Sequence, residues 1–279
     1  MKDLFKFGGN LGNKTNTILA IVGAVIILFI WYILTASGNI IPAKILPSPF
    51  LVFKQMGSLF IDHELISEAK YSISLNLGGY FFGILFAIPL GFILGIYALP
   101  KGLFTKYTDG LRYLPPPAIA GIFTAILGYG FGMKMIFLAF AIFISILPCI
   151  IQKINDLQNP KNDKDFVYLQ TIKTLGANNY QKLTKVYIPY VMGKLWDDIV
   201  NLTSITWTYI IIVELLNREG GLGGLIYLFK RQGLIAEMYG VLFIIVFIGI
   251  TQDFILKEIG KILFPYKSGK SFILKLFSK

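Results

Sequence analysis

The chain has 279 residues, of which 55% are hydrophobic and 15% charged, with a mean hydropathy of +0.68. A typical soluble domain has about 25% charged residues, and a water-soluble fold could not enclose this much apolar surface, so the composition favours a membrane protein. The net charge is +11. The basic residues lie between apolar segments, where they set orientation in the membrane, and no nucleic-acid partner is expected.

Six apolar stretches approach the roughly 20 residues that a membrane-spanning helix needs. Their cores contain no Asp, Glu, Lys or Arg, as expected because a charge at mid-bilayer is costly. The third stretch is short and is opened by Pro115-Pro116-Pro117. The predicted fold is all-α: a polytopic membrane protein with six transmembrane helices. They are expected at residues 17–36, 72–98, 113–130, 135–151, 199–213 and 239–251.

The distribution of Lys and Arg predicts the orientation. If the N-terminus is inside, the inner segments carry 19 basic residues and the outer segments carry 7, which favours two cytoplasmic termini. The first apolar run is longer than the roughly 7–15 residues of a signal peptide, so we expect it to be retained. The chain is then a multi-pass protein of the cell (inner or plasma) membrane. Its parts are a cytoplasmic N-terminus (1–16), a transmembrane domain (17–266) with a cytoplasmic loop (152–198), and a basic cytoplasmic tail (267–279).

Two shorter helices are expected outside the spans. Pro49 suits a helix start, and the apolar spacing after it indicates an amphipathic helix at the outer interface. Gly220-Gly221-Leu222-Gly223-Gly224 follows the fifth span. It predicts either a flexible loop or a re-entrant turn followed by a short helix, because glycine permits backbone angles closed to other residues.

The second span carries a small residue at every fourth position. Such a stripe lets another helix backbone approach closely in a membrane. It predicts either ordinary packing within the chain or a face that slides during transport. The stripe consists of Gly79, Gly83, Ala87, Gly91 and Gly95.

Polar residues in the fifth span are candidates for lining a translocation path: Asn201, Ser204, Trp207, Thr208 and Glu214. Some of the hydroxyl groups can instead bond the backbone one turn back. Glu214 lies near the predicted outer end, where we expect its carboxylate to meet water. Solvated ends are likewise expected for Gln252 and Asp253 at the inner surface.

Several catalytic and cofactor chemistries are excluded. Gly8–Thr15 looks like a phosphate-binding loop, but Asn13 replaces the glycine before the lysine, and Gly269-Lys270-Ser271 lacks the upstream glycine. The single histidine, His63, and the single cysteine, Cys149, provide neither a His/Cys metal site nor a nucleophile–histidine pair. No catalytic residue, metal or cofactor is expected in this chain.

The segment 170–189 resembles the EAA loop of binding-protein-dependent ABC importer permeases, whose pattern is EAA-x3-G-x9-I-x-L-P. The glycine, the spacing, the apolar pair and the proline match, whereas Gln, Thr and Ile replace Glu, Ala and Ala at the front. The missing acid puts one polar contact to the ATPase in doubt. The expected coupling residues are Gln170, Thr171, Ile172, Gly176, Ala177, Val186, Ile188 and Pro189.

Further segments are similar to one branch of that family, the permeases for sulfonates, taurine and nitrate. These segments are Leu46-Pro47-Ser48-Pro49, Trp207, Glu214-Leu215-Leu216, Gly221-Leu222-Gly223, Asp253 and Phe264-Pro265-Tyr266. Together the resemblance covers about residues 20–266.

The resemblance implies a type I ABC importer permease that translocates a small solute by alternating access. Two copies would pair as a homodimer in the lipid bilayer. Two separate ATPase subunits, which would hold ATP and Mg²⁺, would dock on a coupling helix at residues 166–183. An extracytoplasmic substrate-binding protein would deliver the solute. The alternatives are a self-sufficient secondary transporter or channel, for which ionisable residues mid-membrane would be expected, and a membrane enzyme, for which no catalytic cluster is found.

Overall fold

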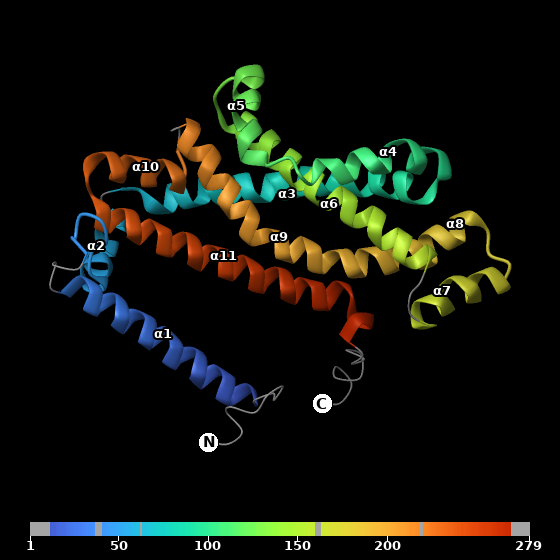
Figure 1. Cartoon of the computed structure of the whole chain (residues 1–279), viewed down its shortest axis with the longest axis horizontal. Helices are drawn as coiled ribbons and strands as arrows, with labels where there is room; N and C mark the ends of the chain where they lie inside the picture. Colours follow the sequence, from blue (N-terminus) through green and yellow to red (C-terminus); the bar gives the residue numbers. More distant parts are fainter. Residues whose placement is uncertain (1–11, 37–40, 62, 160–162, 218–219, 269–279) are drawn as a thin grey trace. The chain divides into compact units, whose positions relative to one another are not determined.

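A computed structural model describes residues 12–36, 41–61, 63–159, 163–217 and 220–268 (Figure 1). All regular structure in these ranges is helical. Most of the predicted N-terminal segment 1–16 and of the tail 267–279, and with the tail Gly269-Lys270-Ser271, lies outside the described residues. The chain divides into two compact units, one built from the residues up to Leu65 with Leu228–Phe243, and the other from Ile66–Tyr227 with the residues from Ile244 on.

The first unit contains α1 (Asn13–Ala36), α2 (Pro49–Ile61), the end of α10 (Leu222–Gln232) and the start of α11 (Ile235–Leu263). The Trp31 indole N–H donates to the Pro47 carbonyl at 3.0 Å, and the Trp31 ring stacks on Phe243. Leu59 is fully buried and lies against Gly240. The helix predicted after Pro49 is therefore present, and it packs on the first turns of α11.

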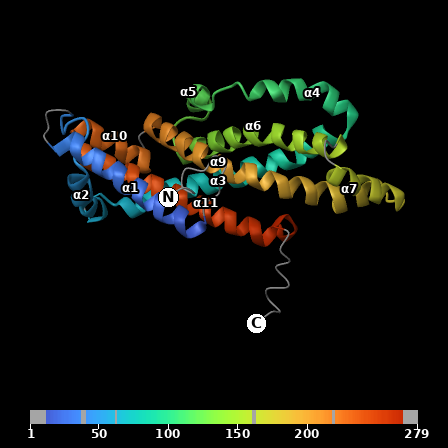
Figure 2. The same ribbon diagram turned by 60° about the horizontal axis from the view of Figure 1, so that its bottom comes forward.

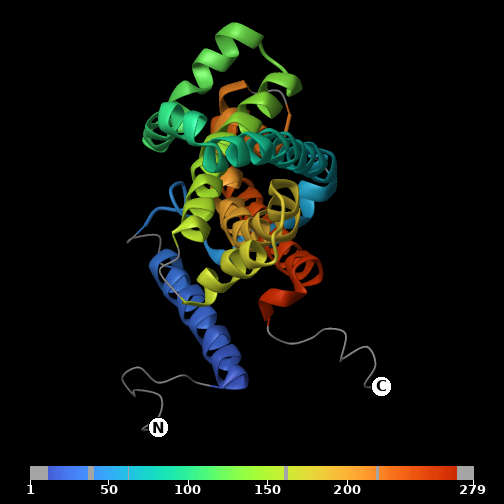
Figure 3. The same ribbon diagram turned by 90° about the vertical axis from the view of Figure 1, so that its right-hand side faces the viewer.

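The second unit contains α3 (Leu65–Ile96) from Ile66 on, α4 (Ala98–Leu111), α5 (Pro116–Leu127), α6 (Phe131–Gln158), α7 (Asp163–Thr174), α8 (Asn179–Lys182) and α9 (Ile188–Asn217). A π-helical stretch, Leu183–Tyr187, joins α8 to α9. The long helix α6 lies beside α9 (Figures 2 and 3). Side chains from α3, α6 and α9 form the core of this unit: Tyr80, Ala87, Phe92, Ile142, Ile146, Ile150, Ile154, Val191, Leu195 and Ile199.

Five described helical segments are long and apolar enough to cross a membrane: Lys14–Ala36, Leu65–Ile96, Phe131–Gln158, Asn179–Leu216 and Ile235–Leu263. Five of the six predicted spans lie within these helices, although the second predicted span, 72–98, extends two residues beyond the end of its helix. The predicted third span, 113–130, contains only the 12-residue α5. At 1.5 Å per residue this helix is about 18 Å long, well short of the roughly 30 Å hydrocarbon core. The prolines at the start of α5, Pro115 as its N-cap and Pro116 and Pro117 in its first turn, and Gly128 with φ +73° after it set these limits.

The small-residue stripe of α3 lies against α6. A Cβ atom added at Gly79, Gly83, Gly91 or Gly95 would come within 2.6–2.8 Å of a residue on α6, while Ala87 is fully buried. The opposing α6 residues are spaced by four or eight positions: Leu138, Ile142, Ile150 and Ile154. Small residues on one helix thus receive the large side chains of the next, which is how helices pack closely in lipid.

Candidate functional site

The segment with the EAA-like pattern forms two helices separated by a turn at Gly176. The amide of Gly176 donates to the Lys173 carbonyl at 3.0 Å, and the amide of Ala177 donates to Ile172 at 3.2 Å. This pair of bonds is a Schellman motif, which requires a left-handed residue, and Gly176 has φ +70°. The sequence predicted helical periodicity through 166–185. The structure corrects this to α7, a turn and α8.

A capping box starts the second helix. The Asn178 side chain accepts from the Gln181 amide at 2.8 Å, and the Gln181 side chain accepts from the Asn178 amide at 2.9 Å. Both ends of the turn are therefore fixed by hydrogen bonds, so the path of the chain from α7 to α8 is well defined. Figure 1 shows α7 and α8 where α6 ends and α9 begins.

The predicted coupling residues on α7 and the turn are largely exposed. Gln170, Thr171 and Gly176 are exposed, whereas Ile172 and Ala177 are half-buried. A shallow groove of about 400 Å³ runs along α7, lined by Val167, Gln170, Thr171, Thr174 and Leu175. Leu175 is 77% exposed. Val167, on the same groove, is 56% exposed.

The second half of the motif anchors the segment to the bundle. Leu183 and Tyr187 pack against the core of the second unit. Pro189 lies in the first turn of α9, and its carbonyl accepts a 2.6 Å hydrogen bond from the Tyr266 hydroxyl. Partial burial raises the pKa of Tyr266, so the hydroxyl stays a donor. Val186 is half-buried and Ile188 is 39% exposed.

The five path candidates on α9 divide between two faces. Asn201, Ser204 and Thr208 are exposed, and their spacing of three and seven residues places them on one side of the helix. Trp207 is only 4% exposed and Glu214 is fully buried. The structure therefore brings three of the candidates together on an open polar face, here called the α9 polar face.

Trp207 belongs to a buried chain of polar side chains. Its indole N–H donates to Gln252 of α11 at 2.9 Å, and Gln252 donates to Asn76 of α3 at 2.8 Å. Asn76 is fully buried, and its Nδ2 has no hydrogen-bond partner among the described residues. Gln252 was expected at a solvated helix end. Instead it links α9 to α3, because its amide both donates and accepts.

A cleft of about 570 Å³ opens between α9 and α11, next to the α9 polar face. Asn201 lines it, together with the aromatic residues Trp196, Phe254 and Phe264. Three lysines stand at its rim, each in an ion pair. Lys257 pairs with Asp253, Lys261 with Glu258, and Lys267 with Asp197.

Glu214 lies at the centre of a buried polar cluster at the end of α9. Its carboxylate accepts from the Ser72 hydroxyl at 2.6 Å and from the Gly223 amide at 2.7 Å. The Ser72 oxygen in turn accepts from the Leu222 amide at 2.9 Å, and Glu68 accepts from the Gly221 amide. The first amides of α10 are thus capped by side chains of other helices, where a helix N-terminus favours negative charge. The expectation that the Glu214 carboxylate meets water is wrong in this chain.

Lys134 of α6 completes this group, here called the Glu214 cluster (Glu68, Tyr71, Ser72, Lys134, Glu214 and the amides of 221–223). Its side chain is fully buried, donates to the Tyr71 hydroxyl at 3.2 Å and interacts electrostatically with Glu214. The cluster was not predicted from the sequence, because Lys134 lies one residue before a predicted span. The signal was present, since Lys134 and Glu214 each directly flank an uncharged apolar core.

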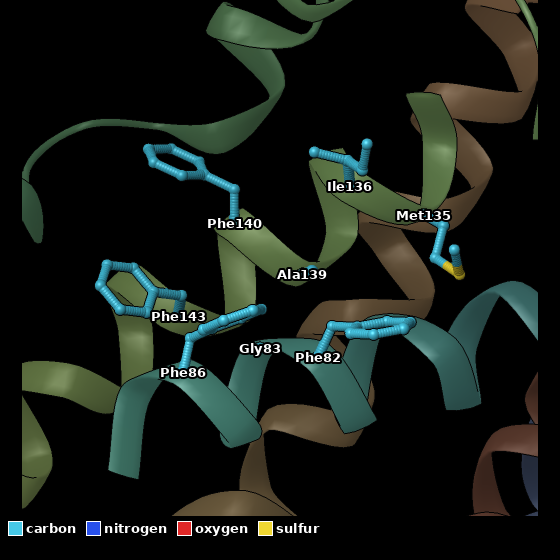
Figure 4. A pocket seen from close by; sticks show the side chains of 8 residues that line it. All are labelled: Phe82, Gly83, Phe86, Met135, Ile136, Ala139, Phe140 and Phe143. Atoms are coloured by element: carbon cyan, nitrogen blue, oxygen red, sulfur yellow. The ribbon is translucent and has the colours of Figure 1, made fainter. Parts of the chain in front are cut away.

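An apolar groove of about 340 Å³ lies along the seam where α3 and α6 meet near Gly83 (Figure 4). It is lined by Phe82, Gly83, Phe86, Met135, Ile136, Ala139, Phe140 and Phe143. None of these side chains can hydrogen-bond strongly or ionise, so the groove suits lipid tails or another apolar surface. Within the described ranges, no group of three or more His, Cys, Asp or Glu side chains could hold a metal ion.

Comparison with known proteins links this architecture to transport. The chain is 25% identical over 224 residues to a probable ABC transporter permease protein of Brucella melitensis, covering 80% of this chain and 85% of that protein. It is 22% identical over 210 residues to the taurine transport system permease protein TauC of Escherichia coli, covering 74% of each chain. It is 20% identical over 231 residues to the putative aliphatic sulfonates transport permease protein SsuC of Bacillus subtilis, covering 82% of this chain and 81% of that one. No protein-family model matches the chain.

The fold is also found among solved structures. A chain of the MetNI methionine ABC transporter, solved in inward-facing conformations, matches with a TM-score of 0.56 and 18% identity, covering 71% of this chain and 94% of that one. The predicted resemblance to ABC importer permeases, including taurine and sulfonate permeases, is confirmed. The chain is a multi-pass membrane protein with an all-helical fold of this type.

Proposed function

We propose that this chain is the membrane-spanning permease subunit of an ATP-binding-cassette importer. The observation that carries the proposal is the α7–Gly176–α8 segment. It combines the spacing of the EAA pattern with a hydrogen-bonded turn, an exposed groove and an anchor in the bundle. The similarity to ABC permeases over 74% or more of the chain supports the same conclusion.

In this proposal α7 and the following turn dock in a groove of a separate ATPase subunit, which binds ATP and Mg²⁺ and performs the hydrolysis. The permease itself is no enzyme. Movement of the docked segment would pass to α9 without a flexible joint, because α8, the π-helical stretch and α9 are continuous. Alternating access then follows from a displacement of the segment by the ATPase.

The α9 polar face is the proposed lining of the route. The Ser204 and Thr208 hydroxyls each donate to a backbone carbonyl of α9, whereas the exposed Asn201 amide is unfavourable against lipid, so this face favours water, solute or a second protein surface over lipid. A second copy of the chain would enclose these polar groups, which makes a permease homodimer the proposed assembly. Trp207 and Glu214, on the buried side of α9, would then hold this helix in place without lining the route.

The proposed cargo is a small organic anion of the sulfonate or taurine type, or nitrate, delivered by an extracytoplasmic binding protein. Similarity to TauC and SsuC supports the class.

The proposed topology keeps both termini in the cytoplasm. Five full spans would place them on opposite sides, so in this proposal the 12-residue α5 with its flanking residues, 113–130, makes a sixth, incomplete crossing. The basic residues of the inner segments support this orientation.

A second candidate function is an ion-coupled carrier that works without an ATPase. One observation favours it: Glu214 and Lys134 are ionisable and fully buried in spanning helices, and such residues mark ion or proton pathways in many transporters. Their hydrogen bonds to a turn and to neighbouring helices provide a structural role instead, so the importer is preferred.

Uptake energetics separate the two candidates. Right-side-out vesicles from cells that express the chain with its neighbouring genes are tested with radiolabelled taurine, an alkanesulfonate and nitrate. For an importer, uptake requires the binding protein outside and ATP inside, and it survives collapse of the ion gradients by ionophores. Uptake abolished by ionophores and independent of internal ATP would establish the carrier.

A further inference from the structure

Two tryptophans of α9 face two glycines of α11 at the same spacing. Trp196 and Trp207 are 11 positions apart in one helix, and Gly249 and Gly260 are 11 positions apart in the other. A Cβ atom added at Gly260 would collide with the Trp196 indole, and one added at Gly249 would lie 3.6 Å from Cδ1 of Trp207. Eleven positions are about three helical turns, so the two rings lie on one side of α9, and α11 runs antiparallel to it.

Each indole also donates a hydrogen bond to α11. The Trp196 N–H donates to the Leu256 carbonyl at 2.9 Å, and the Trp207 N–H donates to the Gln252 side chain at 2.9 Å. Because an indole N–H can only donate, Gln252 turns its oxygen to Trp207 and its amide N–H to Asn76 of α3. A ring on a glycine and a hydrogen bond thus act at both places, here called the Trp196 contact and the Trp207 contact.

Much of α11 is exposed in this chain. Only 11% of its most apolar window is buried, and Phe247, Ile250 and Phe254 are 71%, 64% and 62% exposed. Lipid provides no hydrophobic attraction between helices, so their association depends on close packing and on hydrogen bonds between them. The Trp196 and Trp207 contacts supply both, and they therefore determine where α11 lies on α9.

The residues after Gly260 extend the Trp196 contact toward the start of α9. The Tyr266 hydroxyl donates to the Pro189 carbonyl at 2.6 Å. A Cβ atom added at Gly193 would lie 2.7 Å from the Tyr266 hydroxyl oxygen, so α9 also has a glycine where α11 brings a ring. This is the end of α9 that continues directly from α8 and the π-helical stretch.

We propose that Trp196 and Trp207 are positioning residues that hold α11 on α9, so that the two helices move as one body during transport. The attachment itself is independent of the proposed function, and only the movement during transport rests on it. Loss of either contact loosens α11 and leaves α9 in the core of the second unit. The α9 residues in that core are Val191, Leu195 and Ile199.

The test measures the distance between α9 and α11 in the full-length protein in lipid nanodiscs. Cys149 is replaced by alanine, and spin labels are attached at Ile205→Cys on α9 and Ile262→Cys on α11. The native side chains at these positions are 44% and 67% exposed. Labelled chains are diluted with unlabelled chains, so that only distances within one chain contribute to the pulsed-EPR distribution.

Gly260→Ala is expected to broaden this distance distribution about twofold, because the added methyl group displaces the Trp196 ring and loosens α11 locally. Gly249→Ala is the matched control, since its Cβ atom would make an ordinary contact with Trp207 and the distribution should stay that of the native chain. A native distribution in Gly260→Ala, or an equal broadening in Gly249→Ala, would overturn the proposal.

Two milder variants cover the case in which Gly260→Ala does not fold. Trp196→Phe and Trp207→Phe each keep an aromatic ring but remove the N–H that donates to α11. Both should broaden the same distribution. Trp31→Phe also loses an indole hydrogen bond, but in the first unit, and should leave the distribution unchanged. A native distribution in either α9 variant would overturn the proposal.

Joint movement is tested on the chain assembled with its ATPase subunits. The native distance should be the same without nucleotide and with trapped ATP. Trp196→Phe should lower, severalfold, the amount of solute taken up per ATP hydrolysed, a ratio that loss of folded protein alone would not change. A native distance that differs between the two states, or an unchanged ratio, would overturn the joint movement. If the nanodisc results hold and no ATPase assembles with the chain, the attachment stands and the proposed function fails.

Discussion

Ser72 and Glu214 are 142 positions apart in the chain, yet the hydroxyl of one donates a 2.6 Å hydrogen bond to the buried carboxylate of the other. The same hydroxyl oxygen accepts from the first amide of α10. One small side chain therefore connects α3, α9 and α10, and four predictions start from relationships of this kind.

Replacement of Ser72 by alanine should lower the stability of the protein. The change leaves the Leu222 amide and one Glu214 oxygen without their partner in a buried site, which typically costs about 1–3 kcal/mol. The measurement is the midpoint of thermal unfolding in detergent micelles. Ser74→Ala is the control, because Ser74 is exposed and bonds only its own helix backbone. Equal midpoints for the two variants would contradict the structural role of Ser72.

Enlargement of the α3 stripe should push α3 away from α6. A Cβ atom at Gly91 would lie 2.7 Å from Ile150, so Gly91→Ala should cost about 1–3 kcal/mol by overpacking. Gly121→Ala on α5 meets nothing within 4 Å and serves as the control. Thermal unfolding and the yield of monodisperse protein measure the effect. If Gly91→Ala proved as stable as the control, the close contact of α3 with α6 would be refuted.

The turn at Gly176 should tolerate asparagine and reject valine. The left-handed backbone is open to Asn but strained for a β-branched residue, while an added Cβ atom meets no neighbour there. Gly176→Val should fold and reach the membrane, yet lose uptake while the associated ATPase still hydrolyses ATP. Gly176→Asn should retain most of the uptake. Normal uptake by the valine variant would count against this turn as the coupling element.

An apolar side chain on the α9 polar face should block transport without unfolding the protein. Ser204→Leu places a large group among Asn201, Ser204 and Thr208, and we expect at least a severalfold loss of uptake with an unchanged unfolding midpoint. Ser74→Leu is matched to it, since both serines are exposed on spanning helices and each bonds a backbone carbonyl of its own helix. A similar loss of uptake in both variants would show that the α9 polar face has no special role in transport.

Hydropathy predicted the elements that depend on long apolar runs. Five of the predicted spans lie almost entirely within observed helices, and the short helix predicted after Pro49 is present. Of the two alternatives for the glycine-rich segment 220–224, the turn followed by a short helix is the one observed, as α10. The predicted spans were too short because the nearest charged residues were taken as the ends of the helices, whereas α6 and α9 continue well past these residues. The third span fell short for a local reason, the three prolines 115–117, one before α5 and two in its first turn.

The parts that sequence could not predict depend on distant partners. A charge beside an apolar run looks solvated, and only the fold shows that Lys134 and Glu214 lie in one buried cluster. The break at Gly176 was not predicted, although glycine is the residue that most often ends a helix in a left-handed conformation. Its capping pair, Asn178 and Gln181, was a local signal that could have revealed the second helix start.

The central claim, an importer permease that docks ATPase subunits through α7 and its turn, is tested most directly by purification from native membranes. The tagged chain is solubilised in mild detergent, and the proteins that accompany it are identified by mass spectrometry. The matched comparison is a chain in which exposed Gln170, Thr171 and Leu175 are replaced by aspartate. The account predicts a stoichiometric ATPase with the native chain and its loss from the substituted chain at equal expression. A stable, monodisperse native chain that transports its solute without any ATPase would contradict it.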